Sequence, residues 1–350
     1  TWGPTGTGMN DDYQACLLGL NADSDWFLHA PYNYDRALIR NQLAYELTDE
    51  MGMWAPDWRH VEVYLNRDRD GVVSSADYAG VYVLMEAVEQ GQARLDIAGG
   101  IIPWGNADRD PPEMSGGYIW KIDRSNPTSP GFTAGDQDLQ WVYPRDPRTP
   151  IEDEIEENQN ATDEQEQWVV DYFNAFRTAL QDPDINDPDG YGKYIDPVSW
   201  VDHHMLSVLM MNVDALRLNT YLYKDRDGRV EYGPVLDFDR SAESLDGRDD
   251  DPYVWRSEVS DFGTDFFGNA TQRWWGDLFS DPGFWQLYVD RWQMWRRSTL
   301  SDENVSAVIE RIAGELRESQ ERNFEKWRSY RPRRSSGFDS GLLDGTWGGS

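Results

Sequence analysis

Four polar residues stand at the two ends of a predicted β-hairpin. Asp214 and Asn219 precede its first strand with the spacing D-x-x-x-x-N, and its second strand ends in a D-F-D triplet that contains Asp237 and Asp239. Phosphoryl transfer needs a carboxylate that orients or deprotonates the attacking hydroxyl, and carboxylate and amide oxygens that hold magnesium against nucleotide phosphates. Protein kinases place these groups on two loops that flank a short hairpin, with the same spacing. The pattern favours phosphoryl transfer, and a solvated hairpin with acidic ends is the alternative.

A second oxygen-rich loop has the pattern of an EF-hand calcium loop. Oxygen side chains occupy its positions 1, 3, 5 and 9, glycine position 6, an apolar residue position 8 and a carboxylate position 12. Position 12 is Asp instead of the bidentate Glu, and the loop joins predicted strands instead of helices, so a plain acidic turn is the alternative. The expected calcium ligands are Asn66, Asp68, Asp70, Ser74, Asp77 and the main-chain carbonyl of Val72.

Local patterns indicate which elements position these loops. A helix is expected from Asp35, as its N-cap, to about Met51, because apolar residues recur every four positions and glycine follows. Two strands, 61–65 and 78–86, alternate or run apolar with β-branched residues and enclose the calcium-like loop. These elements form the first predicted part of the chain, residues 1–95.

The middle of the chain is predicted to be less regular. Residues 96–160 are rich in Gly, Pro, Asp and Asn, so we expect an irregular insertion and linker with one strand around Lys121. Residues 161–350 should be mainly helical. A capping box at Thr162 opens one helix, and a largely apolar helix over 197–212 leads into the D-x-x-x-x-N loop.

Two aromatic features in the helical part have structural interpretations. His203 and His204 are adjacent, so they point to different faces of a helix and make a poor metal pair, and we expect packed or solvated histidines. One further helix is expected from Ser301 to about Trp327. A stripe at helical spacing favours core packing over sugar stacking, and it consists of Trp285, Tyr288, Trp292 and Trp295.

The composition limits the possible partners. The 350 residues carry a formal net charge of −32, and 39% of them are hydrophobic, which is enough to build a core. Such an acidic surface repels nucleic acid, and it repels nucleotide phosphates unless cations intervene. There is no apolar run of membrane-spanning length. The single Cys16 excludes a disulfide within the chain.

Several segments, in order along the chain, resemble the spore coat protein H (CotH) family. This family is an atypical, secreted protein kinase-like fold, so the resemblance implies an α+β, two-lobed kinase-like domain that spans residues 1–350. It also implies that the chain lacks the family's N-terminal strands and last helix. The matching segments are D-W-F-L-H-A-P-Y-N-Y-D-R-A-L-I-R-N from Asp25, Y-A-G-V-Y-V-L-M-E from Tyr78, N-V-D-A-L-R-L-N-T-Y-L-Y-K-D from Asn212 and G-P-V-L-D-F-D-R-S from Gly233.

The resemblance implies a role for each residue that matches a family position. Asp214 would be the catalytic aspartate and Asp237 a ligand of Mg²⁺ or Mn²⁺, with Asn219 and Asp239 completing the metal side. Three further residues are candidates on the nucleotide side, although each also has a structural alternative. Glu86 could cap or pair structurally, Arg40 could lock its helix, and Lys121 could form a surface ion pair.

The function expected from the resemblance is transfer of the ATP γ-phosphate to Ser or Thr of secreted, surface or coat proteins. The location would be extracellular or at the cell surface. The alternative is a non-catalytic, calcium-binding acidic surface or coat module. Protein substrate, metal preference and oligomeric state are not determined by the sequence.

Overall fold

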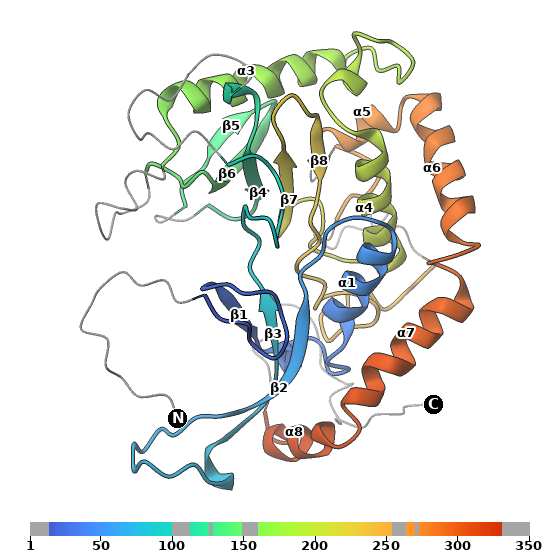
Figure 1. Cartoon of the computed structure of the whole chain (residues 1–350). Helices are drawn as coiled ribbons and strands as arrows, with labels where there is room; N and C mark the ends of the chain where they lie inside the picture. Colours follow the sequence, from blue (N-terminus) through green and yellow to red (C-terminus); the bar gives the residue numbers. More distant parts are fainter. Residues whose placement is uncertain are drawn as a thin grey trace.

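The computed structural model describes residues 14–99, 113–125, 129–148, 160–253, 264–269 and 273–330. The described chain is a mixed helix-and-sheet (α+β) structure with two antiparallel sheets (Figure 1). The three-stranded sheet has the order β1-β3-β2, where β1 is Trp26–His29, β2 is Trp58–Tyr64 and β3 is Tyr78–Glu86. The predicted hairpin around the calcium-like loop is therefore confirmed, and β3 has the predicted bounds.

The second sheet has five strands in the order β5-β6-β4-β7-β8. The predicted catalytic hairpin forms its β7 and β8. Residues 96–160 are more regular than expected, because they supply the other three strands and not one. The strands are β4 Tyr118–Ile122, β5 Phe132–Ala134, β6 Gln137–Tyr143, β7 Thr220–Lys224 and β8 Val230–Tyr232.

Seven α-helices and four short 3-10 helices are present in the described part of the chain. In Figure 1, α1 and α7 lie on the side of the three-stranded sheet and α3 covers one end of the five-stranded sheet. The helices are α1 Arg40–Glu50, α3 Asp163–Ala179, α4 Pro197–Leu209, α5 Trp275–Leu278, α6 Pro282–Trp295, α7 Asp302–Glu315 and α8 Ser319–Trp327, with η1 Pro31–Asn33, η2 Ser75–Asp77, η3 Glu113–Ser115 and η4 Tyr191–Lys193.

Local capping explains where several helices begin. The predicted capping box of α3 is confirmed, because Thr162 and Gln165 each accept the other's backbone N–H. Asp196 caps α4 by accepting the N–H of Ser199, with Pro197 at the first helical position.

Two predicted helices have different bounds in the structure. The first begins at Arg40 and not at Asp35, since the Asp35 carboxylate accepts the N–H groups of Leu38 and Arg40 from outside the helix. The predicted helix over 301–327 is two helices, α7 and α8. Gly314 lies in the last turn of α7, where glycine's low helix propensity favours an end.

One continuous hydrophobic core links both sheets and most helices. His203 and His204 are buried in it, as predicted, and burial lowers the pKa of each to about 3. Tyr288, Trp292 and Trp295 of the aromatic stripe of α6 pack on this core, so core packing is the correct interpretation for these three residues. Trp285 is 36% exposed and stacks on Phe267. Trp295 also donates from Nε1 to the Asp202 carboxylate at 3.0 Å.

The last described helix returns to the three-stranded sheet. The side chain of Asn323 accepts the N–H of Val81 at 2.9 Å. Trp327 lies so close to Gly80 that a Cβ on Gly80 would be 2.6 Å from the indole nitrogen, and Gly80 has a φ of 122°. The end of α8 is therefore fastened to β3 at a position that only glycine fits. None of the described helices is long and apolar enough to cross a membrane.

Candidate active site

Asn212 fixes the loop that follows α4. Its side-chain oxygen accepts the N–H groups of Asp214 at 3.1 Å and Ala215 at 3.2 Å, and its amide donates to the carbonyl of Asp237 at 2.8 Å. One side chain therefore holds the start of the D-x-x-x-x-N loop against the D-F-D segment. Asp214 itself is only 7% exposed.

Asn219 makes the second connection between these two segments. It lies directly before β7 with a φ of 50°, a left-handed conformation that Asn tolerates better than most residues. Its side-chain amide donates to Oδ2 of Asp237 at 2.8 Å. The two ends of the predicted catalytic hairpin thus meet in space.

Asp237 and Asp239 place two carboxyl groups close together in a poorly solvated region. The N–H of Asp239 donates to Oδ1 of Asp237 at 3.3 Å. Burial, then the negative charge of Asp237, raises the pKa of Asp239 to about 9. A divalent cation between these carboxylates would remove the repulsion, so the donor set fits Mg²⁺ or Mn²⁺.

His29 joins this group from the end of β1. Its Nε2 is buried and has no hydrogen-bond partner. The charges of Asp237 and Asp35 act to raise the pKa of His29, but burial outweighs them and the pKa is lowered. The sequence contains no signal for this residue, because its proximity to Asp237 arises from tertiary structure.

Asp214 lies among three arginines. The nearest, Arg217, binds Oδ1 of Asp214. Arg240 lies 3.4 Å from Oδ2 and Arg248 lies 3.7 Å from Oδ1. Asp246 shares two of these arginines, with Arg240 at 3.5 Å and Arg248 at 2.8 Å from its Oδ2. These arginines were not predicted from the sequence as site residues.

Arg40 and Glu86 were predicted to lie on the nucleotide side. In the structure, both side chains are engaged in contacts within the protein. Arg40 binds Asp35 and donates to the carbonyls of residues 241–243 at 2.6 to 3.2 Å. Glu86 is 1% exposed and is bound by Arg94 at 2.7 Å, by the Asn21 side chain and by the N–H of Asp57. These contacts match the structural alternative considered for each residue.

Lys121 lies on β4, opposite Tyr221 of β7. Its amino group is 4.0 Å from the carboxylate of Asp123, and a quarter of its side chain is exposed. The charges of Asp123 and Asp237, together with burial as the largest cause, raise the pKa of Tyr221 above its usual range. Lys121 is thus the cross-strand partner of Tyr221, a residue on which the charge of Asp237 acts.

The calcium-like loop forms the tip of the β2–β3 hairpin. Asn66 donates to Oδ1 of Asp70 and to the carbonyl of Val72, both at 3.3 Å, while its own side-chain oxygen is buried without a partner. Asp77 accepts the N–H and hydroxyl of Ser74. Several predicted ligands therefore converge.

The carboxylates of this loop are nevertheless not gathered tightly. In the described ranges, one group of three His, Cys, Asp or Glu side chains has ligand atoms within 4.8 Å of one another, and it consists of Asp23, Asp25 and Glu89. There the buried Arg94 already supplies a cation, at 3.2 Å from Asp23 and 3.3 Å from Glu89. His29, Asp237 and Asp239 do not form such a group, so a metal ion would have to draw them closer together.

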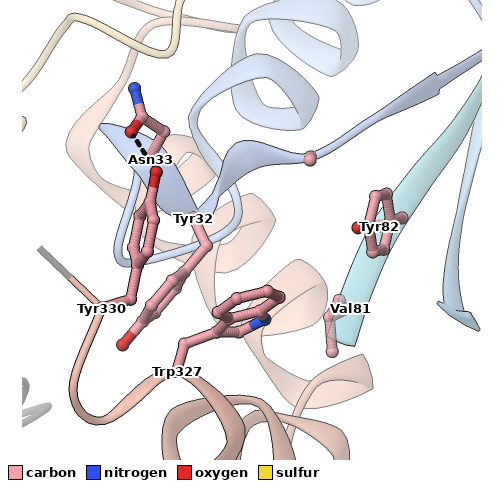
Figure 2. A pocket seen from close by; sticks show the side chains of 7 residues that line it. Tyr32, Asn33, Val81, Tyr82, Trp327 and Tyr330 are labelled. Atoms are coloured by element: carbon pink, nitrogen blue, oxygen red, sulfur yellow. Dashed lines mark hydrogen bonds between the residues drawn. The ribbon is translucent and has the colours of Figure 1, made fainter. Parts of the chain in front are cut away.

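A cavity of about 170 Å³ lies apart from these residues, between η1, β3 and the end of α8 (Figure 2). Its wall is mainly aromatic, and the Tyr330 hydroxyl donates to the Asn33 side chain at 3.1 Å. It contains none of the carboxylates discussed above, so it offers no groups for phosphoryl transfer. The lining residues are Ala30, Tyr32, Asn33, Val81, Tyr82, Trp327 and Tyr330.

Comparison with known proteins identifies one family. A family model described as "CotH kinase protein" matches residues 6–342, nearly the whole chain. No curated protein matches the chain significantly.

Proposed function

The chain belongs to the CotH kinase family, and from this premise we propose that it transfers the γ-phosphate of ATP to Ser or Thr hydroxyls of proteins. The observation that carries the proposal is the 2.8 Å contact between Asn219 and Asp237, with Asp214 on the same loop. These residues are the types that phosphoryl transfer requires, and the contact brings their two loops together.

In the proposed reaction, the acceptor hydroxyl oxygen forms a bond to the γ-phosphorus while the bond from that phosphorus to the β–γ bridging oxygen breaks. ADP leaves with that electron pair. Asp214 orients the hydroxyl and receives its proton. Asn212 contacts both Asp214 and Asp237, and Asn219 contacts Asp237. These contacts keep the two aspartates in a fixed relative position during this step.

Asp237, Asp239, Asn219 and the unpartnered Nε2 of His29 would hold Mg²⁺ or Mn²⁺. Such an ion neutralises developing charge on the phosphates and offsets their repulsion from a chain with a net charge of −32. The imidazole of His29 favours Mn²⁺ over Mg²⁺, because Mg²⁺ prefers oxygen ligands.

We further propose that the two sheets correspond to the two lobes of a kinase-like fold. The three-stranded sheet with α1 would be the upper lobe, and the five-stranded sheet with α3 and α4 the lower. Arg40 then joins the lobes, because it extends from α1 to the carbonyls after the D-F-D triplet. Lys121 is the proposed nucleotide-side cation, while Arg40 and Glu86 act as supports.

Family membership alone supports the remaining parts of this proposal. Secretion, an extracellular or surface location, and surface or coat proteins as substrates are compatible with it, and each needs its own test.

A non-catalytic calcium-binding surface module is the second candidate. It is favoured by the loop from Asn66 to Asp77, where the buried side-chain oxygen of Asn66 has no partner within the protein. Ca²⁺ is the expected ion for such an oxygen-rich loop.

The test is transfer of labelled γ-phosphate from ATP with Mg²⁺ or Mn²⁺ to a Ser/Thr-rich acceptor. Asp214→Asn and Asp237→Asn should each reduce transfer by about 10²-fold or more. Asp189→Asn is the matched control, because Asp189 is 85% exposed and pairs with Lys193, four residues further along the chain. A folded wild-type chain that neither transfers phosphate nor binds ATP would overturn the kinase proposal and favour the calcium module.

A further inference from the structure

One helix binds the main chain on both sides of Asp237. The side-chain oxygen of Asn41 accepts the N–H of Phe238 at 2.6 Å, and the hydroxyl of Tyr45 donates to the carbonyl of Leu236. Both residues belong to α1, which lies on the side of the three-stranded sheet (Figure 1). The D-F-D triplet follows β8 of the five-stranded sheet. The two contacts therefore connect a helix beside one sheet to a segment that leaves the other.

These contacts fix the two peptide groups that flank the Cα atom of Asp237. The carbonyl of Leu236 belongs to the peptide group before this atom, and the N–H of Phe238 belongs to the one after it. The second group is also held at its other end, because the carbonyl of Asp237 accepts the Asn212 amide at 2.8 Å. Peptide groups are planar, so fixing both of them fixes φ and ψ of Asp237 and the direction in which its side chain leaves the backbone.

The residue types on α1 indicate that binding, and not packing alone, is the role of these two side chains. Asn41 and Tyr45 are four positions apart, so they lie on the same face of the helix. Asn41 is 4% exposed and Tyr45 is 1% exposed. Polar atoms are costly to bury unless they form hydrogen bonds. Leu43, Ala44 and Leu47 already supply buried apolar contacts of this helix.

The carboxylates of the metal side act electrostatically on the same helix. Burial raises the pKa of Tyr45 well above its usual range, and the charges of Asp237 and Asp239 add to this increase. Tyr45 therefore keeps its proton at physiological pH, and its hydroxyl remains a donor to the carbonyl of Leu236.

We propose that Asn41 and Tyr45 are positioning residues, which set the direction of the Asp237 carboxylate and thereby the affinity of the site for its metal ion. The inference rests on the proposed kinase function and adds two residues of α1 to that site. Each acts through the main chain of the D-F-D segment. Metal affinity then depends on the position of a helix that supplies no metal ligand.

Tyr45→Phe removes the hydroxyl and keeps the ring. It should weaken Mn²⁺ binding about tenfold, measured by electron paramagnetic resonance without ATP or acceptor, because groups that orient a ligand contribute about this much to metal affinity. Tyr118→Phe is the matched control, since Tyr118 is also buried and donates to a main-chain carbonyl, that of Met114 at 2.9 Å. Wild-type Mn²⁺ affinity in Tyr45→Phe would overturn the role of Tyr45.

Asn41→Ala tests the contact on the other side of Asp237. It should also weaken Mn²⁺ binding about tenfold. Asn323→Ala should not, although Asn323 is likewise buried and accepts a main-chain N–H. Unchanged affinity in Asn41→Ala would overturn the role of Asn41. An equal loss of affinity in a variant and its control would contradict the proposal as well, because a general loss of stability would then be the cause.

Amide hydrogen exchange, followed by nuclear magnetic resonance, keeps the inference testable without a metal. The amide of Phe238 should exchange at least about tenfold faster in Asn41→Ala than in wild-type protein, and Asn323→Ala should leave it unchanged. If wild-type protein binds no Mn²⁺, the proposed metal site fails and exchange decides alone, so an unchanged rate would overturn the positioning role. Weaker Mn²⁺ binding in Tyr45→Phe, in a protein that transfers no phosphate, would support the inference and refute only the kinase proposal.

Discussion

The side-chain amide of Asn219 lies 2.8 Å from Oδ2 of Asp237, although 18 residues and a complete hairpin separate them in the sequence. Asn212 adds a second amide contact, to the carbonyl of the same aspartate. The position of Asp237 therefore depends on two asparagines of the preceding loop. Substitution of either asparagine therefore tests these contacts while the carboxylate of Asp237 stays in place.

Asn219→Ala is expected to lower phosphoryl transfer by about 10²-fold, because it removes a metal-side oxygen and the donor that orients Asp237. The apparent Mn²⁺ requirement should rise in parallel. Steady-state transfer measured over a Mn²⁺ titration checks this. The control is Asn304→Ala in α7, because the Asn304 amide donates to Glu50 and to the carbonyl of Thr299, away from the candidate site. Unchanged transfer and metal requirement would show that Asn219 has no part in the site.

His29→Phe should weaken Mn²⁺ binding about tenfold or more while Mg²⁺ binding changes little, because imidazole is a poor ligand for Mg²⁺. Electron paramagnetic resonance of Mn²⁺ reports binding directly, without catalysis. His60→Phe is the matched control, since His60 binds the carbonyl of Leu38 and Glu315 instead. Equal loss for both metals would indicate a packing role for His29.

Arg40→Lys should destabilise the protein by about 2 to 4 kcal/mol, because an ammonium group cannot replace the fork that contacts Asp35 and three carbonyls. The free energy of unfolding in urea measures this change. Arg311→Lys, at a half-exposed ion pair, should cost less than about 1 kcal/mol. If both substitutions cost the same, the Arg40 contacts contribute little to stability.

Calcium should raise the thermal midpoint of unfolding if the loop from Asn66 to Asp77 binds it. At a free concentration 100 times the Kd, the expected stabilisation is about 2.7 kcal/mol. Asp70→Asn should abolish most of this effect, whereas Asp189→Asn should retain it. Differential scanning calorimetry with Ca²⁺ and with chelator makes the comparison, and the absence of a shift in wild-type protein would argue for a plain acidic turn.

The buried histidines predict acid sensitivity. The pKa of His203 is lowered to about 3 from 6.5, so between these pH values the unfolded chain binds a proton that the folded chain does not. Stability is therefore lost as the pH falls below 6.5, by about 1.4 kcal/mol per pH unit for this residue. His204 acts in the same direction.

His203→Phe removes one of these two contributions. The loss of unfolding free energy between pH 7.5 and 5 should be smaller in this variant by about 2 kcal/mol. Urea denaturation at both pH values gives the answer. An unchanged pH dependence would mean that His203 is protonated in the folded protein.

Local patterns in the sequence predicted the elements well where the pattern was strong. β3 has the predicted bounds because eight of its nine residues form an apolar run after a turn, and α3 begins at its predicted capping box. β5 and β6 were missed because F-T-A is short and Q-D-L-Q-W-V-Y mixes polar and apolar residues, so their strand structure comes from pairing.

The site was predictable only in part for the same reason. The D-x-x-x-x-N spacing and the D-F-D triplet indicated residues that the structure does bring together. His29 and Arg248 had no local signal, because tertiary structure brings them near Asp237 and Asp214. Glu86 has its partners at Asn21, Asp57 and Arg94, and such contacts leave no regular spacing in a sequence.

The attachment of α8 to β3 limits how the molecule can move. The chain leaves the three-stranded sheet after β3 and returns to it through α7 and α8, where Asn323 holds Val81. The three-stranded sheet is thus closed by a contact between residues 242 positions apart in the sequence. Substitutions at Gly80 or Asn323 would therefore loosen the sheet from the C-terminal helix without touching any residue of the candidate site.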